Sequence, residues 1–430
     1  MRHELPVEQL GAMGPGMAEA IQACVHCGFC LPTCPTYVEL GQEADSPRGR
    51  ILLMKEVLEG TLEPEAAQPH IDRCLGCLAC ETACPSGVSY GHLVSPYRAL
   101  VGKKVSKTWI QRLKRWLVFA TLPHPSRLRW ALRLAAGTRW LQPLTPKALR
   151  PMLRMVPPRL PKQVTLPEFS PAQGERRGRV ALVAGCAQQV LSPEINEATI
   201  RVLTRNGFDV VVPRHQACCG ALAWHVGEPE KARHTARAVM RSMPTDADAV
   251  ISNAAGCGSG MHEYSTLFAG EPDEAEAVRF SSLVTDISVW LTKAGFVTPD
   301  PVSPVRVGYH DACHLAHAQR VRSAPRSLLQ GIPGITLIEL QESELCCGSA
   351  GTYNIDQPDI AAELGLRKAT RVREADVRIL AAANIGCLVQ IRQHLDALGH
   401  ETEVSHPIVL LDRAYRGESL IRGALESSKA

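Results

Sequence analysis

The sequence predicts a multidomain protein of mixed α+β and α/β class. Near its start one four-cysteine motif occurs twice, a basic stretch without any Asp or Glu follows, and the second half repeats a pattern of short apolar strands alternating with helices. We therefore expect four parts: a helical domain at 15–100 that contains both copies of the cysteine motif, a basic, Trp- and Pro-rich helical linker at 101–175, and two α/β domains with small parallel sheets at 176–300 and 301–425.

The composition is that of a globular protein that carries unusually many thiols. Hydrophobic residues make up 45% of the 430 residues and charged residues 21%. The first residues contain no apolar run behind a basic end, and stretches such as 116–122 are far shorter than the ~20 residues of a membrane span. The sequence therefore predicts a cytoplasmic protein. Because the cytosol keeps thiols reduced, its sixteen cysteines favour metal or redox chemistry over disulfides.

The first eight cysteines form two copies of C-x2-C-x2-C-x3-C-P, at 24–35 and 74–85. This run binds clusters in bacterial-type ferredoxins, where the first three thiolates hold one cluster and the fourth holds the other. Zinc also binds paired CxxC motifs, but four zinc ligands explain neither the two copies nor the trailing proline. We predict a ferredoxin-like domain with two [4Fe–4S] clusters. Their ligands are Cys24, Cys27, Cys30 and Cys84 for the first cluster, and Cys34, Cys74, Cys77 and Cys80 for the second.

Two features near these motifs bear on the clusters. Gly28 and Gly76 lie inside the loops, where the backbone must wrap closely round a cluster. The intervening DSPRGR segment at 45–50 supplies Arg48 and Arg50, which either stabilise the reduced clusters or are solvated arginines of a turn.

The other eight cysteines form a duplicated set built round Cys-Cys-Gly, here called the CCG sites. They are Cys186, Cys218, Cys219 and Cys257 in the first copy, and Cys313, Cys346, Cys347 and Cys387 in the second. Each follows the end of a predicted strand, at 179–185, 208–213 and 248–253, then at 305–310, 336–340 and 377–382. Because the carboxyl ends of parallel strands meet at one edge, four sulfurs are expected to converge in each copy.

The connecting helices are expected at 192–205, with Ser192 as cap and Pro193 at the first position, and at 229–243, 324–330 and 358–374. Each CCG site holds a further cluster, a dithiol or a bound metal, or has kept its cysteines without a cofactor. His310 and His314 bracket Cys313 and either ligate, tune the site, or serve as plain hydrogen-bonding groups.

The linker concentrates positive charge. Residues 82–167 contain sixteen Lys or Arg and no acidic residue, so a chain of net charge +4 carries −12 elsewhere. Residues 105–118 predict an amphipathic helix, which suits an anionic membrane surface, an acidic partner subunit, or simple packing between domains. No recognised nucleic-acid motif accompanies the charge. Its apolar face carries Trp109, Leu113, Trp116 and Leu117, and its basic face carries Lys107, Arg112, Lys114 and Arg115. Trp130 and Trp140 follow, and seven prolines from 143 to 167 predict an extended connection.

In this order of parts the chain resembles the iron–sulfur subunit of bacterial glycolate oxidase. The stretches that carry the resemblance include CVHCGFCLPTCPTY, DRCLGCLACETACPSGV, CCGALAWH, LCCGSAGTYNI and ANIGC. The resemblance implies a complex in which an FAD-binding subunit, with a second flavoprotein-like subunit, oxidises glycolate to glyoxylate. This chain then relays single electrons towards a quinone. It has no G-x-G-x-x-G after a strand, so FAD is expected only on the partner subunit, and no catalytic residue is assigned here.

Related systems share the CCG domains and remain alternatives. These are the anaerobic glycerol-3-phosphate dehydrogenase, D-lactate oxidation, and thiol–disulfide catalysis of the heterodisulfide reductase type. A CCG half that only holds the flavin subunit is a further alternative. The basic linker leads us to expect peripheral association with the inner face of the cell membrane.

Overall fold

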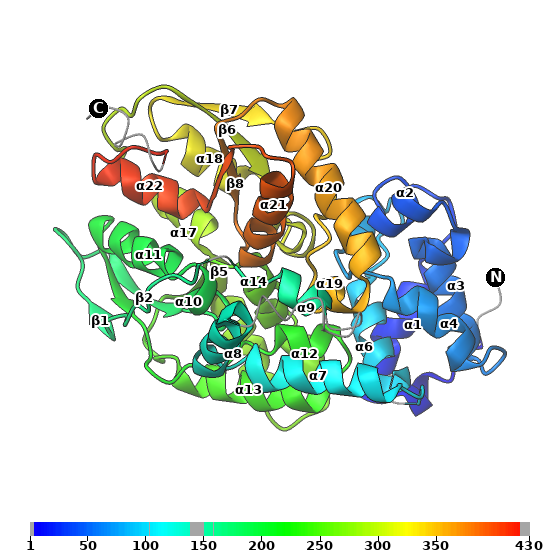
Figure 1. Ribbon diagram of the computed structural model, residues 1–430. Helices are drawn as coiled ribbons and strands as arrows, with labels where there is room; N and C mark the ends of the chain where they lie inside the picture. Colours follow the sequence, from blue (N-terminus) through cyan, green and yellow to red (C-terminus); the bar gives the residue numbers. More distant parts are fainter. Residues whose placement is uncertain (1–3, 103, 138–149, 158, 422–430) are drawn as a thin grey trace.

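The computed structural model describes residues 4–102, 104–137, 150–157 and 159–421. In Figure 1 a helical N-terminal part lies beside two α/β lobes, and two linker helices, α7 and α8, run along their lower front. The predicted class is confirmed in outline, with mostly helical structure and small parallel sheets. Trp140, Pro143, Pro146 and Pro158 lie outside the described residues.

The N-terminal part is helical, and the described residues contain no strand before β1. Pro35, Pro47 and Pro64 each stand in the first turn of a helix, and the Ser46 hydroxyl caps α3 by accepting from Gly49 N at 3.0 Å. The core of this part is lined by buried side chains such as Met17, Met54 and Tyr97. Its helices are α1 (Gly14–Gln22), α2 (Pro35–Leu40), α3 (Pro47–Leu58), α4 (Pro64–Asp72), α5 (Ala79–Thr82) and α6 (Gly91–Val101), with 3-10 turns at Val7–Met13 and Glu43–Asp45.

The linker forms three helices, α7 (Trp109–Thr121), α8 (Pro125–Gly137) and α9 (Arg150–Arg154). Thr108 and Gln111 make a capping box, so α7 begins four residues later than the predicted helix. None of the described helices combines the length and apolar character needed to cross a membrane.

The first CCG copy is built on a five-stranded sheet of order β1-β3-β2-β4-β5, parallel except for the edge strand β1. The three predicted strands are confirmed as β2, β3 and β4. The flanking β1 and β5 were not predicted, since they span only two and three residues. The strands are β1 (Phe169–Ser170), β2 (Gly178–Val183), β3 (Phe208–Val211), β4 (Ala249–Ser252) and β5 (Val284–Asp286). The helices are α10 (Gln188–Leu191), α11 (Glu194–Arg205), α12 (Ala221–His225), α13 (Pro229–Ser242), α14 (Ala255–His262), α15 (Tyr264–Leu267), α16 (Glu274–Leu283) and α17 (Ile287–Ala294).

The predicted start of one helix is wrong. Ser192 closes the short helix α10 through a backbone bond from its N–H to Gln188 O at 2.9 Å, so it is not the cap of α11. Pro193 takes the cap position instead and α11 begins at Glu194, because α10 runs almost directly into it.

The second copy has a four-stranded, fully parallel sheet of order β7-β6-β8-β9. The predicted strand at 305–310 and the predicted helix at 358–374 have the bounds of β6 and α20, whereas β9 was not predicted. The strands are β6 (Val305–His310), β7 (Ile335–Glu339), β8 (Ile379–Ala382) and β9 (Glu403–Ser405). A π-turn at His314–Ala318 is followed by α18 (Ser323–Gln330), α19 (Tyr353–Asp356), α20 (Pro358–Glu374), α21 (Ile385–Ala397) and α22 (Pro407–Tyr415).

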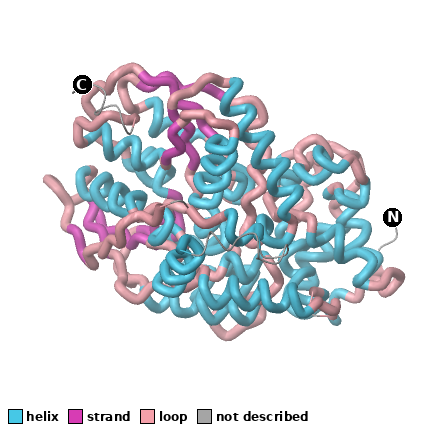
Figure 2. The backbone as a smooth tube through the Cα atoms, viewed as in Figure 1, coloured by secondary structure: helices cyan, strands magenta, loops and turns pink. Residues whose placement is uncertain are grey.

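The two sheets share one buried core. Val180 and Ile251 of the first sheet belong to the same hydrophobic cluster as Val307 and Ile379 of the second. Figure 2 shows the strands in two groups, each surrounded by helices. The chain therefore holds both CCG copies in one packed unit.

Candidate iron–sulfur and cysteine sites

The two N-terminal motifs follow the same backbone path. His26 and Gly28 in the first loop have φ of 55° and 87°, and the equivalent Gly76 and Leu78 in the second have φ of 64° and 59°. Each loop thus turns through two left-handed residues, one glycine and one larger residue. The sequence pointed only to the glycines. At Gly28 a Cβ would lie 2.9 Å from Arg48 Nη1, the mobile end of a long side chain, so the left-handed φ of 87° is the stronger reason for glycine at this position.

The first cavity in this part joins both motifs. The four cysteines predicted for the first cluster line it, Cys24, Cys27 and Cys30 of the first motif and Cys84 of the second, and Cys80 lines it too. The rest of its lining is largely apolar, including Val25, Phe29, Ile51 and Val88. Four sulfurs in an apolar lining suit an iron–sulfur cluster.

The second cavity also joins the two motifs, but here the second motif supplies most of the cysteines. Cys34 comes from the first motif, and Cys74, Cys77 and Cys80 come from the second. The structure therefore brings together the sulfurs that the motif spacing predicts for each cluster, in a crossed arrangement. Their role as ligands stays a prediction.

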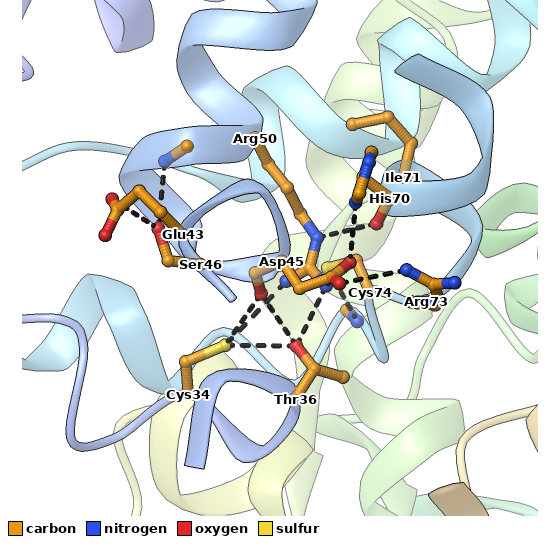
Figure 3. A network of polar contacts seen from close by, with 12 residues as sticks. Cys34, Thr36, Glu43, Asp45, Ser46, Arg50, His70, Ile71, Arg73 and Cys74 are labelled. Atoms are coloured by element: carbon orange, nitrogen blue, oxygen red, sulfur yellow. Dashed lines mark hydrogen bonds and ion pairs between the residues drawn. The ribbon is translucent and has the colours of Figure 1, made fainter. Parts of the chain in front are cut away.

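A buried polar network supports Cys34, and Figure 3 shows it from close by. Arg50, only 1% exposed, places Nη1 at 3.7 Å from Cys34 Sγ and donates from Nη2 to Thr36 Oγ1 at 2.8 Å and from Nε to His70 O at 2.7 Å. Asp45 is fully buried and pairs with Arg50 at 3.5 Å and with Arg73 at 3.0 Å. Arg50 is therefore not a solvated arginine of a surface turn.

Arg48 has a different role. It forms an ion pair with Glu43 at 2.6 Å and donates to His26 O at 2.9 Å, so it holds the first cysteine loop from its more exposed side. Of the two arginines in DSPRGR, Arg50 touches a cysteine sulfur and Arg48 touches the loop backbone.

Cys74 lies in a cationic surrounding. Burial alone would raise the pKa of Cys74, but the Arg50 and Arg98 guanidiniums and the Gly76 N–H outweigh it and lower that pKa. Arg98 also donates to Cys74 O at 2.6 Å, and the Tyr90 hydroxyl donates to Cys74 Sγ at 3.7 Å. Sequence reasoning missed Arg98 and Tyr90. The one available signal was a lone arginine in the apolar helix that follows the second motif.

The CCG sulfurs converge in each copy. Cys186 Sγ lies 3.6 Å from Cys218 Sγ in the first, and Cys313 Sγ lies 3.8 Å from Cys346 Sγ in the second. The last cysteine of each set stands in the first turn of a helix, α14 or α21. The ends of the strands and the first turn of this helix therefore bring the cysteines of each copy together. This confirms the predicted convergence of the sulfurs.

The glycine of each Cys-Cys-Gly is needed for its backbone. Gly220 and Gly348 have φ of 79° and 85°, and a Cβ would lie 2.9 Å from Ala232 O in the first copy and 2.7 Å from Ala361 O in the second. The two glycines therefore contact equivalent helices, α13 and α20, in the same register.

Each site favours one thiolate. Hydrogen bonds from Cys186 and Cys219 lower the pKa of Cys218 in the first copy, and hydrogen bonds from Cys346 and Cys387 lower the pKa of Cys347 in the second. A thiolate is the form of cysteine that binds metals and acts as a nucleophile. Both sites can therefore serve redox or metal chemistry.

The second CCG site lies against the second cysteine cavity. Cys77, Cys346 and Tyr353 belong to one buried cluster, and Cys313 packs against it. The Tyr353 hydroxyl donates to Arg73 O at 2.8 Å, and His314 Nε2 lies 3.1 Å from Gly76 O. The N-terminal motifs and the second CCG copy thus meet at their sulfurs.

The two predicted histidines separate in role. His314 faces the cysteine loop of the N-terminal part and meets the His225 ring edge-on at 5.1 Å. His310 is fully buried at the end of β6, and a ring nitrogen of His310 lies within 4.8 Å of the Cys347 and Cys387 sulfurs. Only His310 joins the CCG sulfurs.

The amphipathic linker helix turns part of its basic face towards the protein. Lys114 donates to Ile355 O at 3.2 Å and Arg115 pairs with Glu228 at 3.0 Å, so part of the predicted basic face attaches α7 to the CCG lobes. Trp109 and Trp116 of α7 are 73% and 65% exposed, and Trp130 of α8 is 63% exposed. The outer side of the two helices is therefore apolar and aromatic.

Family models match three segments. A model described as "4Fe-4S dicluster domain" matches residues 20–88, and one described as "Cysteine-rich domain" (CCG) matches residues 180–262 and 307–392. The three segments contain all sixteen cysteines.

Similarity to curated proteins extends over most of the chain. A "Probable glycolate oxidase iron-sulfur subunit" of Bacillus subtilis (strain 168) is 37% identical over 397 residues, 87% of this chain and 89% of that protein. A "Glycolate oxidase iron-sulfur subunit" of Escherichia coli (strain K12) is 36% identical over 403 residues, 93% of this chain and 95% of that protein. A "Lactate utilization protein A" of Oceanobacillus iheyensis is 29% identical over 241 residues, 56% of this chain and 98% of that protein.

Proposed function

Because the chain belongs to the family of glycolate oxidase iron–sulfur subunits, we propose that it carries electrons in a complex that oxidises glycolate to glyoxylate. The chain is then the electron-transfer subunit of an oxidoreductase complex. The observation that carries the proposal is that each of two cavities is lined by cysteines from both four-cysteine motifs. A third group of sulfurs, the second CCG site, lies beside them, where Cys313 packs against the buried cluster that contains Cys77.

The residues fit two [4Fe–4S] clusters, which supply one-electron transfer when bound. We propose Cys24, Cys27, Cys30 and Cys84 as ligands of the first cluster, and Cys34, Cys74, Cys77 and Cys80 as ligands of the second. The protein's own contribution is to bury Cys34 and Cys77 away from water and to hold positive charge beside the second set. Arg50 and Arg98 do this for the second set, since both lie within hydrogen-bond reach of Cys34 or of the Cys74 backbone.

We propose that the second CCG site continues the electron path. Cys313, Cys346, Cys347 and Cys387 form a sulfur set that packs on Cys77, and a group bound there would lie next in line after the second cluster. Cys186, Cys218, Cys219 and Cys257 form the other set, whose proposed role is a redox or metal site of unassigned content. The domain boundaries that we propose are those expected from the sequence, at 15–100, 101–175, 176–300 and 301–425.

The proposed partners are a flavoprotein subunit that holds FAD, a second flavoprotein-like subunit, and a quinone as acceptor. These partners are proposed because the chain belongs to this family. The quinone is supported further by a surface that we propose faces the membrane. This surface comprises Trp109, Leu113, Trp116, Trp130 and Leu134, all exposed on α7 and α8. Arg112, Arg127 and Arg133 lie exposed among them. Aromatic side chains flanked by arginines suit the interface of an anionic bilayer, so we propose peripheral binding to the inner face of the cell membrane.

The test is reduction by substrate. The chain would be purified anaerobically with its flavoprotein partner and treated with glycolate, and cluster reduction followed by EPR. Glycolate is expected to produce reduced-cluster signals that the Cys34→Ser variant loses in part. Reduction by D-lactate or glycerol 3-phosphate, with glycolate inactive, would assign the chain to a related system instead.

A further inference from the structure

The second CCG site contains a buried histidine whose ring is oriented by a hydrogen bond to the backbone. His310 is the last residue of β6 and is fully buried. Its Nδ1 lies 3.0 Å from Ser343 O, a carbonyl that can only accept, so Nδ1 carries the proton and donates. In the neutral ring the other nitrogen, Nε2, then keeps its lone pair.

Nε2 is buried and has no nitrogen or oxygen partner among the described residues, and the group that the ring approaches on this side is the Cys347 sulfur. A ring nitrogen of His310 and the sulfurs of Cys347 and Cys387 lie within 4.8 Å of one another, and Nδ1 is already engaged with Ser343. A buried nitrogen acceptor that meets only a weakly donating thiol among the described residues is poorly satisfied, and a metal ion beside the sulfurs would satisfy it.

The first CCG copy provides an internal comparison. Its strand β2 ends at Val183, the position equivalent to His310 at the end of β6. Gly220 contacts α13 at the position where Gly348 contacts α20, so the two helices can be aligned. In this alignment Val239 of α13 stands where α20 has Lys368. Lys368 Nζ donates to Ser343 O at 3.3 Å, on the same carbonyl that orients His310. The second copy alone has this arrangement.

We propose that His310 is an imidazole ligand of an iron–sulfur cluster held by the second CCG site, and that the first CCG site has no such ligand. This inference rests on the proposed cluster at that site. His310, Cys347 and Cys387 lie within 4.8 Å of one another, and Cys346 and then Cys313 continue this set through sulfur–sulfur contacts. These five donors exceed the four ligands of a single zinc ion, whereas a cluster of several irons offers more positions. Contact with Cys77 also favours a redox group over a structural metal.

A functional consequence follows from charge. Imidazole binds as a neutral ligand and thiolate as an anion, and histidine in place of cysteine raises the potential of an iron–sulfur centre. The second CCG site therefore accepts electrons more readily than an all-cysteine site would. This direction suits an acceptor placed after the second ferredoxin-type cluster.

The experiment uses the full chain, purified anaerobically, in wild-type form and as His310→Gln, His314→Gln and Cys347→Ser. Iron and zinc are counted, and the reduced protein is examined by pulsed EPR for nitrogen hyperfine coupling, with ¹⁵N-histidine labelling to identify the nitrogen. We expect more than eight irons per chain in wild type and a histidine nitrogen coupling. That coupling is lost in His310→Gln and retained in His314→Gln, the matched control. A His310→Cys variant is expected to keep the iron and to lower the midpoint potential of this centre.

The outcomes separate the inference from the function on which it rests. Excess iron that depends on Cys347, without a nitrogen coupling that depends on His310, overturns the inference and leaves the proposed cluster standing. Eight irons in wild type, or one zinc that Cys347→Ser removes, overturns the cluster at this site and the inference together. The two ferredoxin-type clusters would stand in either case.

Discussion

Arg50 gives the clearest link between a single residue and electron transfer. Its guanidinium is buried between Cys34, Thr36 and Asp45, where water screens its charge least. The sequence showed an arginine close to the first motif but not its burial, because DSPRGR also reads as a surface turn. The crossed cysteine sets, in contrast, could be predicted from local spacing alone.

Replacing Arg50 with Gln is expected to lower the midpoint potential of the second cluster, because the reduced, more negative state loses its nearest cation. The expected shift is on the order of 50 mV, since about 59 mV corresponds to a tenfold change in a one-electron equilibrium. An EPR-monitored redox titration measures it. Arg50→Lys keeps the charge and should shift the potential less. Equal potentials in Arg50→Gln and wild type would show that this cation does not tune the cluster.

Gly28→Ala is expected to destabilise the first cysteine loop, because alanine would adopt φ of 87° and its Cβ, 2.9 Å from Arg48 Nη1, would displace that group from its hydrogen bond to His26 O. The loss should exceed that of Gly60→Ala, where φ is 77° and the space around the Cβ is open. We expect a difference of about 1 kcal/mol or more. Iron retention and the urea midpoint of both variants provide the measurement, and equal losses would contradict the steric argument.

At the scale of elements, the duplication made the CCG half predictable. The same order of strand, cysteine and helix occurs twice, so the sequence predicted β2, β3 and β4 and the corresponding strands β6, β7 and β8 of the second copy. The strands β1, β5 and β9 were missed because they span two or three residues and carry no periodic pattern. The sequence predicted an apolar and a basic face for α7 but not which of them contacts the protein. Amphipathic spacing alone does not tell which side of a helix faces the protein, and Lys114 and Arg115 turn inward to bond Ile355 O and Glu228.

The exposed face of α7 leads to a membrane-binding prediction. The double variant Trp109→Ser and Trp116→Ser should fold with nearly unchanged stability, within about 0.5 kcal/mol, because both side chains are exposed. Its binding to anionic lipid vesicles should weaken about tenfold or more, a loss of 1.4 kcal/mol of partitioning.

Vesicle sedimentation measures this, and Phe169→Ser is the control, an exposed aromatic residue on β1 outside the patch. Unchanged vesicle binding by the tryptophan variant would leave α7 and α8 as a contact surface for a protein subunit or as simple connecting helices.

At the scale of the whole molecule, the N-terminal part and the second CCG copy are held together near their sulfurs. Arg367 of α20 pairs with Glu39 of α2 at 3.0 Å and with Glu342 at 2.6 Å, and Thr82 Oγ1 lies 2.7 Å from His317 Nδ1. No local pattern predicted the approach of Cys77 to Cys313, since it depends on packing between segments far apart in the sequence. The convergence within each site was predictable, and the path between sites was not.

The ion pairs of Glu342 lead to a prediction about the pH dependence of stability. Hydrogen bonds from Arg367, and then from Arg371, lower the pKa of Glu342 to about 2, below its ordinary value of about 4.3. The stabilising charge of Glu342 is present above about pH 4.3 and is lost as the pH falls from there through about 2. Glu342→Gln should therefore have a lower urea midpoint than wild type at pH 7, and the difference should shrink by pH 3.

Glu374→Gln is the matched control, because Glu374 pairs with Arg371 alone and is more exposed. A difference between Glu342→Gln and wild type that stays constant from pH 7 to pH 3 would contradict this assignment.

The central claim is that crossed ferredoxin-type clusters pass electrons to a group at the second CCG site. An iron and acid-labile sulfide count with EPR, on anaerobically purified protein, tests it most directly. The account predicts more than eight irons per chain. The excess and its EPR signal should disappear in Cys347→Ser, while the signals of the two [4Fe–4S] clusters remain. Eight irons in wild type, with no change in Cys347→Ser, would contradict the account and leave the CCG half without iron.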